Sequence, residues 1–334
     1  MESNDSRLGD YYEGAGGYDR ETVRFFDVAH EGAQMRAVAH AVDGFARLRG
    51  MQPRSVVVVG TDQVSRAAAA CALALRTPLP VPAFVTPALP AYVGPLDVVA
   101  VVGDCADDAR TGQDTRSLLT AARRGAETVF AGPSRGPIVE DVPDSVFVIP
   151  PLPTTSSASP LRAMATVWAV LDSLVQPGEI TREFLLALAD GVDAELEALS
   201  PQRDDTVNAA RQLRTFTDGA RVLHTGSTPC GGALAGLVAQ LWSVHGIPSG
   251  YASAPELPSA LENANAGGGG GDIFHDPFLD DGPQLVPLKT VVWAESDSVL
   301  PASRAETVEE QGLGDAEVAA RLVARAYAAT AMDA

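Results

Sequence analysis

The stretch VVGDCADDART, residues 101–111, has the pattern of a buried strand that runs out into a loop and then a helix. In an α/β protein, the loop at such a junction is where a phosphate or a sugar commonly sits. Here the loop carries three carboxylates, Asp104, Asp107 and Asp108. Either the site binds something else, or it has lost an earlier ligand.

Strand patterns of the same kind recur on both sides of this stretch. Short β-branched or apolar runs occur as SVVVVG (55–60), LDVVAVVG (96–103), ETVFAG (127–132) and SVFVIP (145–150), separated by helices or loops. The pattern returns in RVLHTG (221–226), GGALAGLVAQLWSVHG (231–246) and LKTVVWAES (288–296). Such alternation predicts an α/β fold with parallel sheets covered by helices on both faces, in two related domains.

The organisation along the chain follows from this pattern. We expect an N-terminal helical segment over residues 1–50, a first domain over 51–178, a helical connector over 179–218 and a second domain over 219–334. One helical pattern covers residues 20–50, and the proline-rich stretch 77–90 is predicted to be a connector. The loop 263–282 contains a run of five consecutive glycines, Gly267–Gly271, which indicates a mobile surface loop, a lid or a segment that crosses to a partner subunit.

Composition limits the classes of function. The net charge of -19 argues against nucleic acid and against anionic membrane surfaces, because the field of the protein repels both. Three scattered cysteines, Cys71, Cys105 and Cys230, predict no disulfide framework and a reducing compartment. The polar, acidic N-terminus is unlike a signal peptide, and no run of 18 apolar residues occurs. We therefore expect a soluble, cytoplasmic protein that binds a small molecule.

Three strand-to-helix junctions are candidate ligand loops: GTDQVSRA (60–67), GDCADDARTGQDT (103–115) and TGSTPCGGA (225–233). None matches the glycine pattern of a dinucleotide-binding loop or of a P-loop, and no C-x-x-C pair suggests zinc. The sequence therefore indicates neither a cofactor nor a metal.

The order of these patterns resembles the double sugar-isomerase (SIS) domain proteins, specifically the bifunctional phosphoglucose/phosphomannose isomerases, from about Asp19 to Asp333. The stretches that carry the resemblance are GYDRETVRFFDVAHEGAQM, SVVVVGTDQVSRAAA, SASPLRAMATVWAVL, HGIPSGYASAPELPSALENAN and LGDAEVAARLVARAYAA. The resemblance implies two SIS domains, each a parallel sheet between helices in the manner of a Rossmann-like sandwich. It also implies a homodimer that acts on carbohydrate derivatives.

The resemblance also implies catalytic residues. Aldose–ketose isomerisation needs an acid to open the ring, a carboxylate to move a proton between C1 and C2, and a cation to steady the enediolate. On this chain the cation maps to Arg162, the ring-opening acid to His275 and the carboxylate to Glu262, with Glu256 as a competitor. The resemblance also implies a lysine at the site. It has no counterpart on this chain, whose single lysine, Lys289, lies in a strand pattern.

The phosphate loops depart furthest from the family pattern. The positions that match the two loops, and that we take as substrate-binding candidates, are Gly60, Thr61 and Ser65 in the first and Gly103, Asp104 and Thr111 in the second. A carboxylate about 4 Å from a phosphate costs roughly 1 kcal/mol or more per charge pair, and more in a lower dielectric. Tight phosphate binding there would need Arg110, Arg116 or a divalent cation as compensation.

Three functions remain open at this point. The first is a phosphosugar isomerase that acts on glucose, mannose or fructose 6-phosphate through an enediol. The second is a non-catalytic or regulatory protein that binds a sugar phosphate on the same scaffold, in agreement with the altered loops and the missing lysine. The third is an enzyme of this scaffold that acts on a different sugar derivative, non-phosphorylated or cationic, for which the acidic loop would be an asset.

Overall fold

The computed structural model describes residues 19–104, 108–153, 155, 157–266 and 286–334. Its strands are β1 (Ser55–Gly60), β2 (Ala83–Thr86), β3 (Asp97–Val102), β4 (Glu127–Ala131), β5 (Phe147–Val148), β6 (Arg221–Thr225), β7 (Ser249–Tyr251), β8 (Leu288–Trp293) and β9 (Ser303–Glu306). Its helices are α2 (Arg20–Val28), α3 (Glu31–Ala41), the 3₁₀ helix η2 (Val42–Leu48), α4 (Gln63–Ala74), α5 (Asp108–Arg123), α6 (Pro137–Glu140), α7 (Pro160–Val175), α8 (Gly178–Ala198), α9 (Ala209–Thr217), α10 (Pro229–Val244), α11 (Leu257–Ala266) and α12 (Asp315–Ala331).

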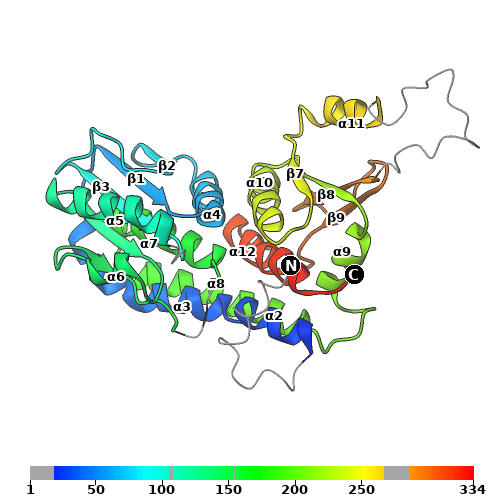
Figure 1. Ribbon diagram of the computed structural model, residues 1–334, viewed down its shortest axis with the longest axis horizontal. Helices are drawn as coiled ribbons and strands as arrows, with labels where there is room; N and C mark the ends of the chain where they lie inside the picture. Colours follow the sequence, from blue (N-terminus) through cyan, green and yellow to red (C-terminus); the bar gives the residue numbers. More distant parts are fainter. Residues whose placement is uncertain (1–18, 105–107, 154, 156, 267–285) are drawn as a thin grey trace, which may run out of the picture.

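The first sheet has the order β2-β1-β3-β4-β5 and is parallel throughout. Alternate side chains of its central strands enter two separate apolar clusters, so both faces are buried. Helices α4 and α7 cover one face, and α5 and α6 cover the other (Figure 1). Because α4 follows β1 and α5 follows β3 on opposite faces, the carboxyl ends of β1 and β3 form the topological switch point where such folds bind ligands.

The second sheet has the order β7-β6-β8-β9 and is also parallel. Side chains from β6 and β8 pack against α10 in the large apolar cluster, which also contains side chains of α12. The predicted fold class, α/β with two parallel sheets flanked by helices, is confirmed. The placement of the domain boundaries near residues 50, 178 and 218 stays a prediction.

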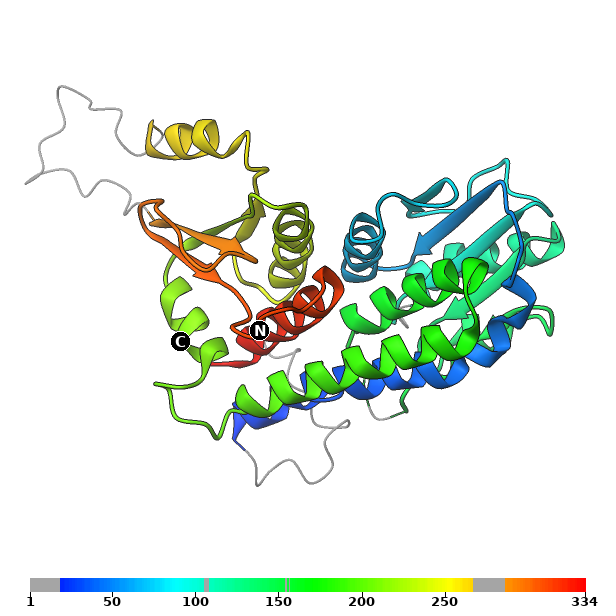
Figure 2. The same cartoon turned by 180° about the vertical axis from the view of Figure 1, so that it is seen from behind.

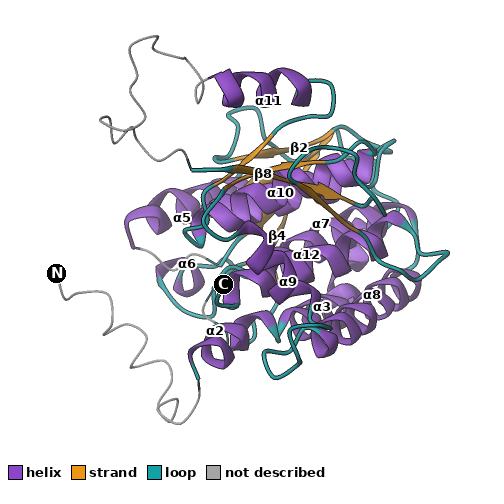
Figure 3. Cartoon of the chain, turned by 90° about the vertical axis from the view of Figure 1, so that its right-hand side faces the viewer, coloured by secondary structure: helices purple, strands orange, loops and turns teal. Residues whose placement is uncertain are grey.

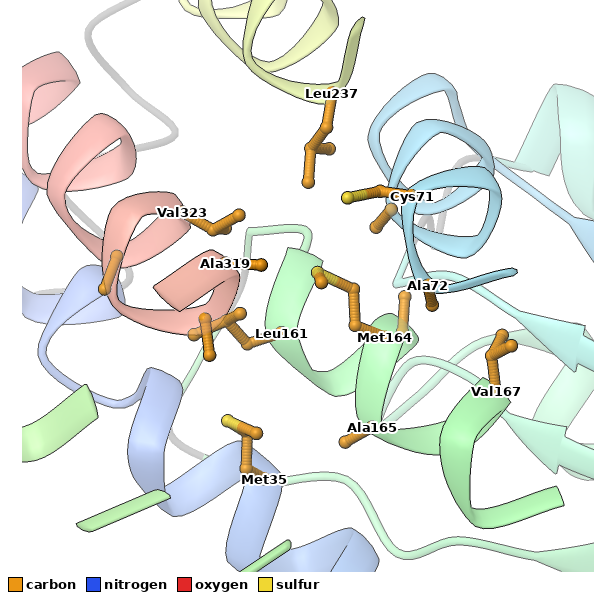
Figure 4. Close-up of a cluster of buried hydrophobic side chains, with 14 of the residues drawn as sticks. Met35, Cys71, Ala72, Leu161, Met164, Ala165, Val167, Leu237, Ala319 and Val323 are labelled. Atoms are coloured by element: carbon orange, nitrogen blue, oxygen red, sulfur yellow. The ribbon is translucent and has the colours of Figure 1, made fainter. Parts of the chain in front are cut away.

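The two halves meet along α4, α7, α10 and α12, as Figures 1 and 2 show from opposite sides. Below this contact, α3 and α8 run together, and Figure 3 shows them as one layer. The alanine-rich sequence of α4 lets that helix approach α10 closely. Met164 lies between the two halves, with Cys71, Leu237 and Ala319 around it (Figure 4), and it has no exposed surface.

Of two local predictions from the sequence, one was confirmed and one was wrong. Residues 20–50 are helical, as expected, and a turn at Ala29 and His30 divides them into α2 and α3, with η2 following α3. This turn carries the side chain of Glu31 toward the start of α7, where it accepts a hydrogen bond. The proline-rich stretch 77–90 contains an edge strand, β2, which pairs in parallel with β1. Edge strands tolerate neighbouring prolines because one of their sides needs no ladder partner.

Across the described residues, none of the helices combines the length and the apolar character that crossing a membrane requires. A search of the same residues finds no group of three or more histidine, cysteine, aspartate or glutamate side chains arranged to hold a metal ion.

The buried contact between the halves predicts a large effect of core truncation. We expect Met164→Ala to lower the free energy of unfolding by about 2–5 kcal/mol, because it removes buried methylenes and leaves a cavity between α4, α7 and α12. Urea unfolding monitored by circular dichroism measures this change. Val299→Ala is the matched control, since Val299 is 97 % exposed, and should shift the value by at most about 0.5 kcal/mol. Equal effects of the two substitutions would contradict the packing described here.

Candidate functional site

The candidate site lies at the carboxyl end of the first sheet, where β3 runs into Asp104. The Asp104 carboxylate accepts a hydrogen bond from Nη1 of Arg162 at 2.7 Å and one from the backbone N–H of Ser159 at 3.0 Å. The backbone N–H of Asp104 donates to the carboxylate of Asp62 at 3.3 Å. Asp104 is therefore one half of an ion pair within the chain.

Arg162 is the other half of this pair and stands in the first turn of α7. The sequence predicted a helix start there, and Ser159 caps it by accepting from the Arg162 N–H at 3.1 Å. The guanidinium is 1 % exposed. Besides its bond to Asp104, Nη1 donates to the carbonyl of Gly132 at 2.8 Å, and Nη2 donates to that of Ile149 at 2.9 Å. Both terminal nitrogens are thus committed within the chain.

The switch point between β1 and β3 is filled by atoms of the chain itself. Asp62 caps α4 and accepts from the backbone N–H and the hydroxyl of Ser65 at 2.8 and 2.7 Å. Gly103 has φ +140°, and a Cβ built on it would lie 2.1 Å from Oγ1 of Thr61. The carboxylate of Asp62 therefore occupies the place at the helix N-terminus where a phosphate would accept N–H groups.

The predicted substrate-binding positions are thereby located. Gly60, Thr61, Ser65, Gly103 and Asp104 come together at this crevice, and apart from the partly exposed Asp104 all of them are buried. Thr111 lies in α5, and its side chain is outside the described part of the chain.

A buried glutamate that sequence reasoning missed lies beside the ion pair. Glu31 is 1 % exposed and accepts from the backbone N–H of Leu161 at 2.9 Å. Burial raises its pKa to about 8, against the hydrogen bonds from Ser159 and Leu161, which lower it. Burial likewise raises the pKa of Asp104 to about 6, opposed chiefly by the charge of Arg162. Glu31 is therefore largely protonated at neutral pH, and Asp104 is largely ionised.

A pocket of about 260 Å³ opens directly over Asp104. Its other lining residues come from α3 and from the loops that follow β4 and β5: Gln34, Pro133, Ser134, Arg135, Pro151, Leu152, Pro153, Thr155 and Ser157. The pocket thus lies outside the carboxyl ends of β3, β4 and β5, the edge at which α/β sheets bind ligands. It is displaced from the filled crevice toward the β5 edge of the sheet.

One wall of this pocket is held by the C-terminal helix. The hydroxyl of Ser157 donates to the carboxylate of Asp27, and the Ser157 N–H donates to the same carboxylate at 3.0 Å. Tyr327, from α12, donates its phenol hydrogen to the Ser157 hydroxyl at 3.1 Å. Burial is the main cause that raises the pKa of Tyr327, so the phenol stays protonated. A helix of the second half therefore shapes a pocket of the first.

The equivalent loop of the second half also receives an internal carboxylate. The N–H of Ser227, just before α10, donates to Oε1 of Glu295 at 2.7 Å. Glu295 follows β8, next to Ala294, whose φ of +58° is uncommon for a residue with a side chain. In both halves, then, an acidic side chain accepts one backbone N–H at the start of the first helix after the first strand: that of Ser65 in the first turn of α4, and that of Ser227 just before α10.

The two candidate glutamates, Glu262 and Glu256, lie elsewhere. Glu262 is exposed on α11, which Figures 1 and 2 place at the far end of the second half from α5, α6 and α7. Glu256 is exposed just before α11 and accepts from the hydroxyl of Ser253 at 2.8 Å. His275 lies outside the described residues. Within one chain, the structure does not bring Glu262 to Arg162.

The comparisons with known proteins concern the fold. No protein-family model matches the sequence, and a search of curated proteins finds no significant match. Solved structures do match over nearly the whole chain. Tagatose-6-phosphate ketose/aldose isomerase from Escherichia coli is similar with a TM-score of 0.62 and 14% identity, over 93% of this chain and 92% of that one. The C-terminal domain of glucosamine-fructose-6-phosphate aminotransferase from Francisella tularensis is similar with a TM-score of 0.59 and 11% identity, over 96% of each chain.

These likenesses show that the chain has the fold of phosphosugar isomerases and related sugar-isomerase domains. At such low sequence identities, structural similarity establishes the fold alone, because function depends on the residues of the site. The narrower resemblance to the phosphoglucose/phosphomannose isomerases stays a prediction.

The buried Glu31 predicts a pH dependence of stability. Its pKa is higher in the folded protein than the ordinary value of 4.5, so its stabilising contribution is complete below about pH 4.5 and is lost progressively up to about pH 8. We expect Glu31→Gln to weaken this decline and to raise the free energy of unfolding at pH 8 by at least about 1 kcal/mol. Urea unfolding between pH 5 and 8 tests this. The exposed Glu197→Gln is the control, and the same pH slope in wild type and Glu31→Gln would contradict the assignment.

The ion pair predicts strong coupling between its two partners. We expect Arg162→Met to lower the free energy of unfolding by about 3–5 kcal/mol, because Asp104, whose side chain is only 13 % exposed, then loses its cation. Adding Asp104→Leu removes that unpaired charge and should restore part of the loss, which a double-mutant cycle in urea measures. Additive effects of the two substitutions would show that the pair is not a unit.

Proposed function

We propose that this protein binds a sugar phosphate in the pocket over Asp104, and that binding rather than isomerisation is its activity. The observation that carries the proposal is the state of Arg162. A cation that steadies an enediolate must turn an N–H group toward the developing charge, whereas Arg162 is paired with Asp104, donates to two carbonyls and has a side chain that is only 1 % exposed, its unpartnered Nε buried as well.

The pocket supports recognition of a small, polar, anionic ligand. Arg135 stands exposed at its rim and, among the described residues, makes no ion pair, so its guanidinium is available for a phosphate. Ser134 next to it adds a hydroxyl. A volume of about 260 Å³ lies just below the range of roughly 300–1,000 Å³ that is typical of small-molecule sites, in agreement with a ligand of monosaccharide size.

The phosphate-binding loops expected from the resemblance offer no such place. Asp62 already accepts the N–H of Ser65 in the first turn of α4, and Glu295 accepts that of Ser227 just before α10. A phosphate at either loop would have to displace a carboxylate that is part of the protein. The rim cation Arg135 needs no such displacement, which is why we assign the phosphate to it.

The isomerase hypothesis is the second candidate and makes a distinct prediction. It would need Glu262 and His275 to reach a sugar held near Arg162, across a homodimer of the kind that the resemblance implies. The position of α11 at the periphery of the molecule is the observation in its favour (Figure 1).

Proton NMR of fructose 6-phosphate with the protein in D₂O separates the two candidates. Under our proposal the ligand signals broaden on addition of protein, while no deuterium enters C1 and no aldose appears. Arg135→Gln should weaken binding at least about tenfold, because a charge-assisted contact to the phosphate is lost. Exposed Arg203→Gln, distant from the pocket in sequence and not among its lining residues, is the control. Deuterium at C1 would instead establish the isomerase, and an unchanged spectrum would contradict both.

A further inference from the structure

The polar groups on the inner wall of the pocket have their hydrogens directed away from it. Thr155 donates its hydroxyl hydrogen to the carbonyl of Leu152 at 3.3 Å. Ser157 donates its hydroxyl hydrogen to Asp27. Asp104, when ionised, has no hydrogen to donate, and it uses its two oxygens for one bond each. All three therefore offer only unused lone pairs to a ligand.

Gln34, on α3, completes this wall. Its Nε2 donates to the hydroxyl oxygen of Thr155 at 2.8 Å. The hydroxyl of Thr155 has one hydrogen, which it donates to the carbonyl of Leu152. The Gln34 atom that faces Thr155 must therefore be the donor Nε2, and this fixes the orientation of the Gln34 amide. The carbonyl oxygen Oε1 then faces the other way. Gln34 is 2 % exposed, and among the described residues its Oε1 has no hydrogen-bond partner.

A buried carbonyl without a hydrogen-bond partner lowers the stability of the folded protein, so its presence in a native structure calls for an explanation. Gln34 and Asp104 line the same pocket, so one ligand can contact both. Among the described residues that line the pocket, the only cation is Arg135, which is exposed at the rim. The pocket is thus divided into an inner wall of acceptors and an outer rim with one cation.

We infer that the ligand enters with its hydroxyl-bearing end inward and its phosphate outward, and that Gln34 selects for a ligand hydroxyl that donates to Oε1. The inference rests on the proposed function and adds the orientation of the ligand and a specificity-determining residue. The sugar hydroxyls satisfy the acceptors of Gln34, Asp104 and Thr155, while the phosphate stays at Arg135 and Ser134. In the reverse orientation the phosphate would meet Thr155, Ser157 and Asp104, none of which has a hydrogen left to donate to it.

The test compares Gln34→Met with Arg135→Gln, using fructose 6-phosphate and inorganic phosphate as probes in isothermal titration calorimetry. Methionine has nearly the shape of glutamine and lacks the acceptor. We expect Gln34→Met to weaken fructose 6-phosphate about tenfold and to leave inorganic phosphate unchanged, while Arg135→Gln weakens both. Unchanged affinity of Gln34→Met for fructose 6-phosphate, or equal loss for both probes, overturns the inference.

The orientation of the ligand can also be tested on the wild-type protein, so that the result does not depend on the folding of a variant. In saturation-transfer difference NMR, the protons at C1 and C3 of fructose 6-phosphate should receive more saturation than those at C6, next to the phosphate. Strongest saturation at C6 would overturn the orientation while leaving the proposed function intact. Absence of any saturation transfer would overturn the proposed function itself, so the two failures are distinguishable.

Discussion

The arrangement of the first half depends on one buried guanidinium. Arg162 reaches from the start of α7 to the ends of three neighbouring strands, through Asp104 after β3, Gly132 after β4 and Ile149 after β5. A buried charge of this kind is tolerated only when it is paired and hydrogen-bonded, and a single opposite charge with two carbonyls meets that condition. The same contacts hold the loops that line the pocket, so the constraint on stability and the shape of the candidate site have one origin.

Acidic side chains have taken the positions at which this fold offers N–H groups to a ligand. Asp62 accepts from the backbone N–H of Ser65 at the start of α4, and Glu295 accepts from that of Ser227 just before α10. Each carboxylate therefore satisfies a donor at a position where this kind of fold can bind an anionic ligand. Internal capping of this type keeps the loops satisfied without a ligand and directs recognition to the neighbouring strand ends. A pocket that is acceptor-lined inside and cationic at its rim follows, because Arg162, the buried cation beside the pocket, is already paired with Asp104.

The sequence predicted the architecture well because the signal is repeated along the chain. Strands such as SVVVVG and DVVAVV are apolar on both faces, which is expected only in a covered parallel sheet. It missed β2, whose prolines hide the strand, and within the correctly predicted helical segment it did not locate the turn at Ala29 and His30, which has no glycine or proline to mark it. It also missed Glu31 and Gln34, since neither stands in a motif; the one available signal was polar residues on the apolar face of a helix.

The sequence by itself determined the fold class, the strand ends that could carry a ligand and the anomaly of acidic residues at one of them, because these depend on local periodicity and on chain order. Only the tertiary structure decided what the acidic residues do. The partner of Asp104 lies 58 positions away, the partner of Glu31 lies 130 away and that of Ser157 lies 170 away. Hydrogen bonds and ion pairs act over about 3 Å in space, whatever the separation in sequence, so their pairing becomes visible only when the packed core has brought the elements together.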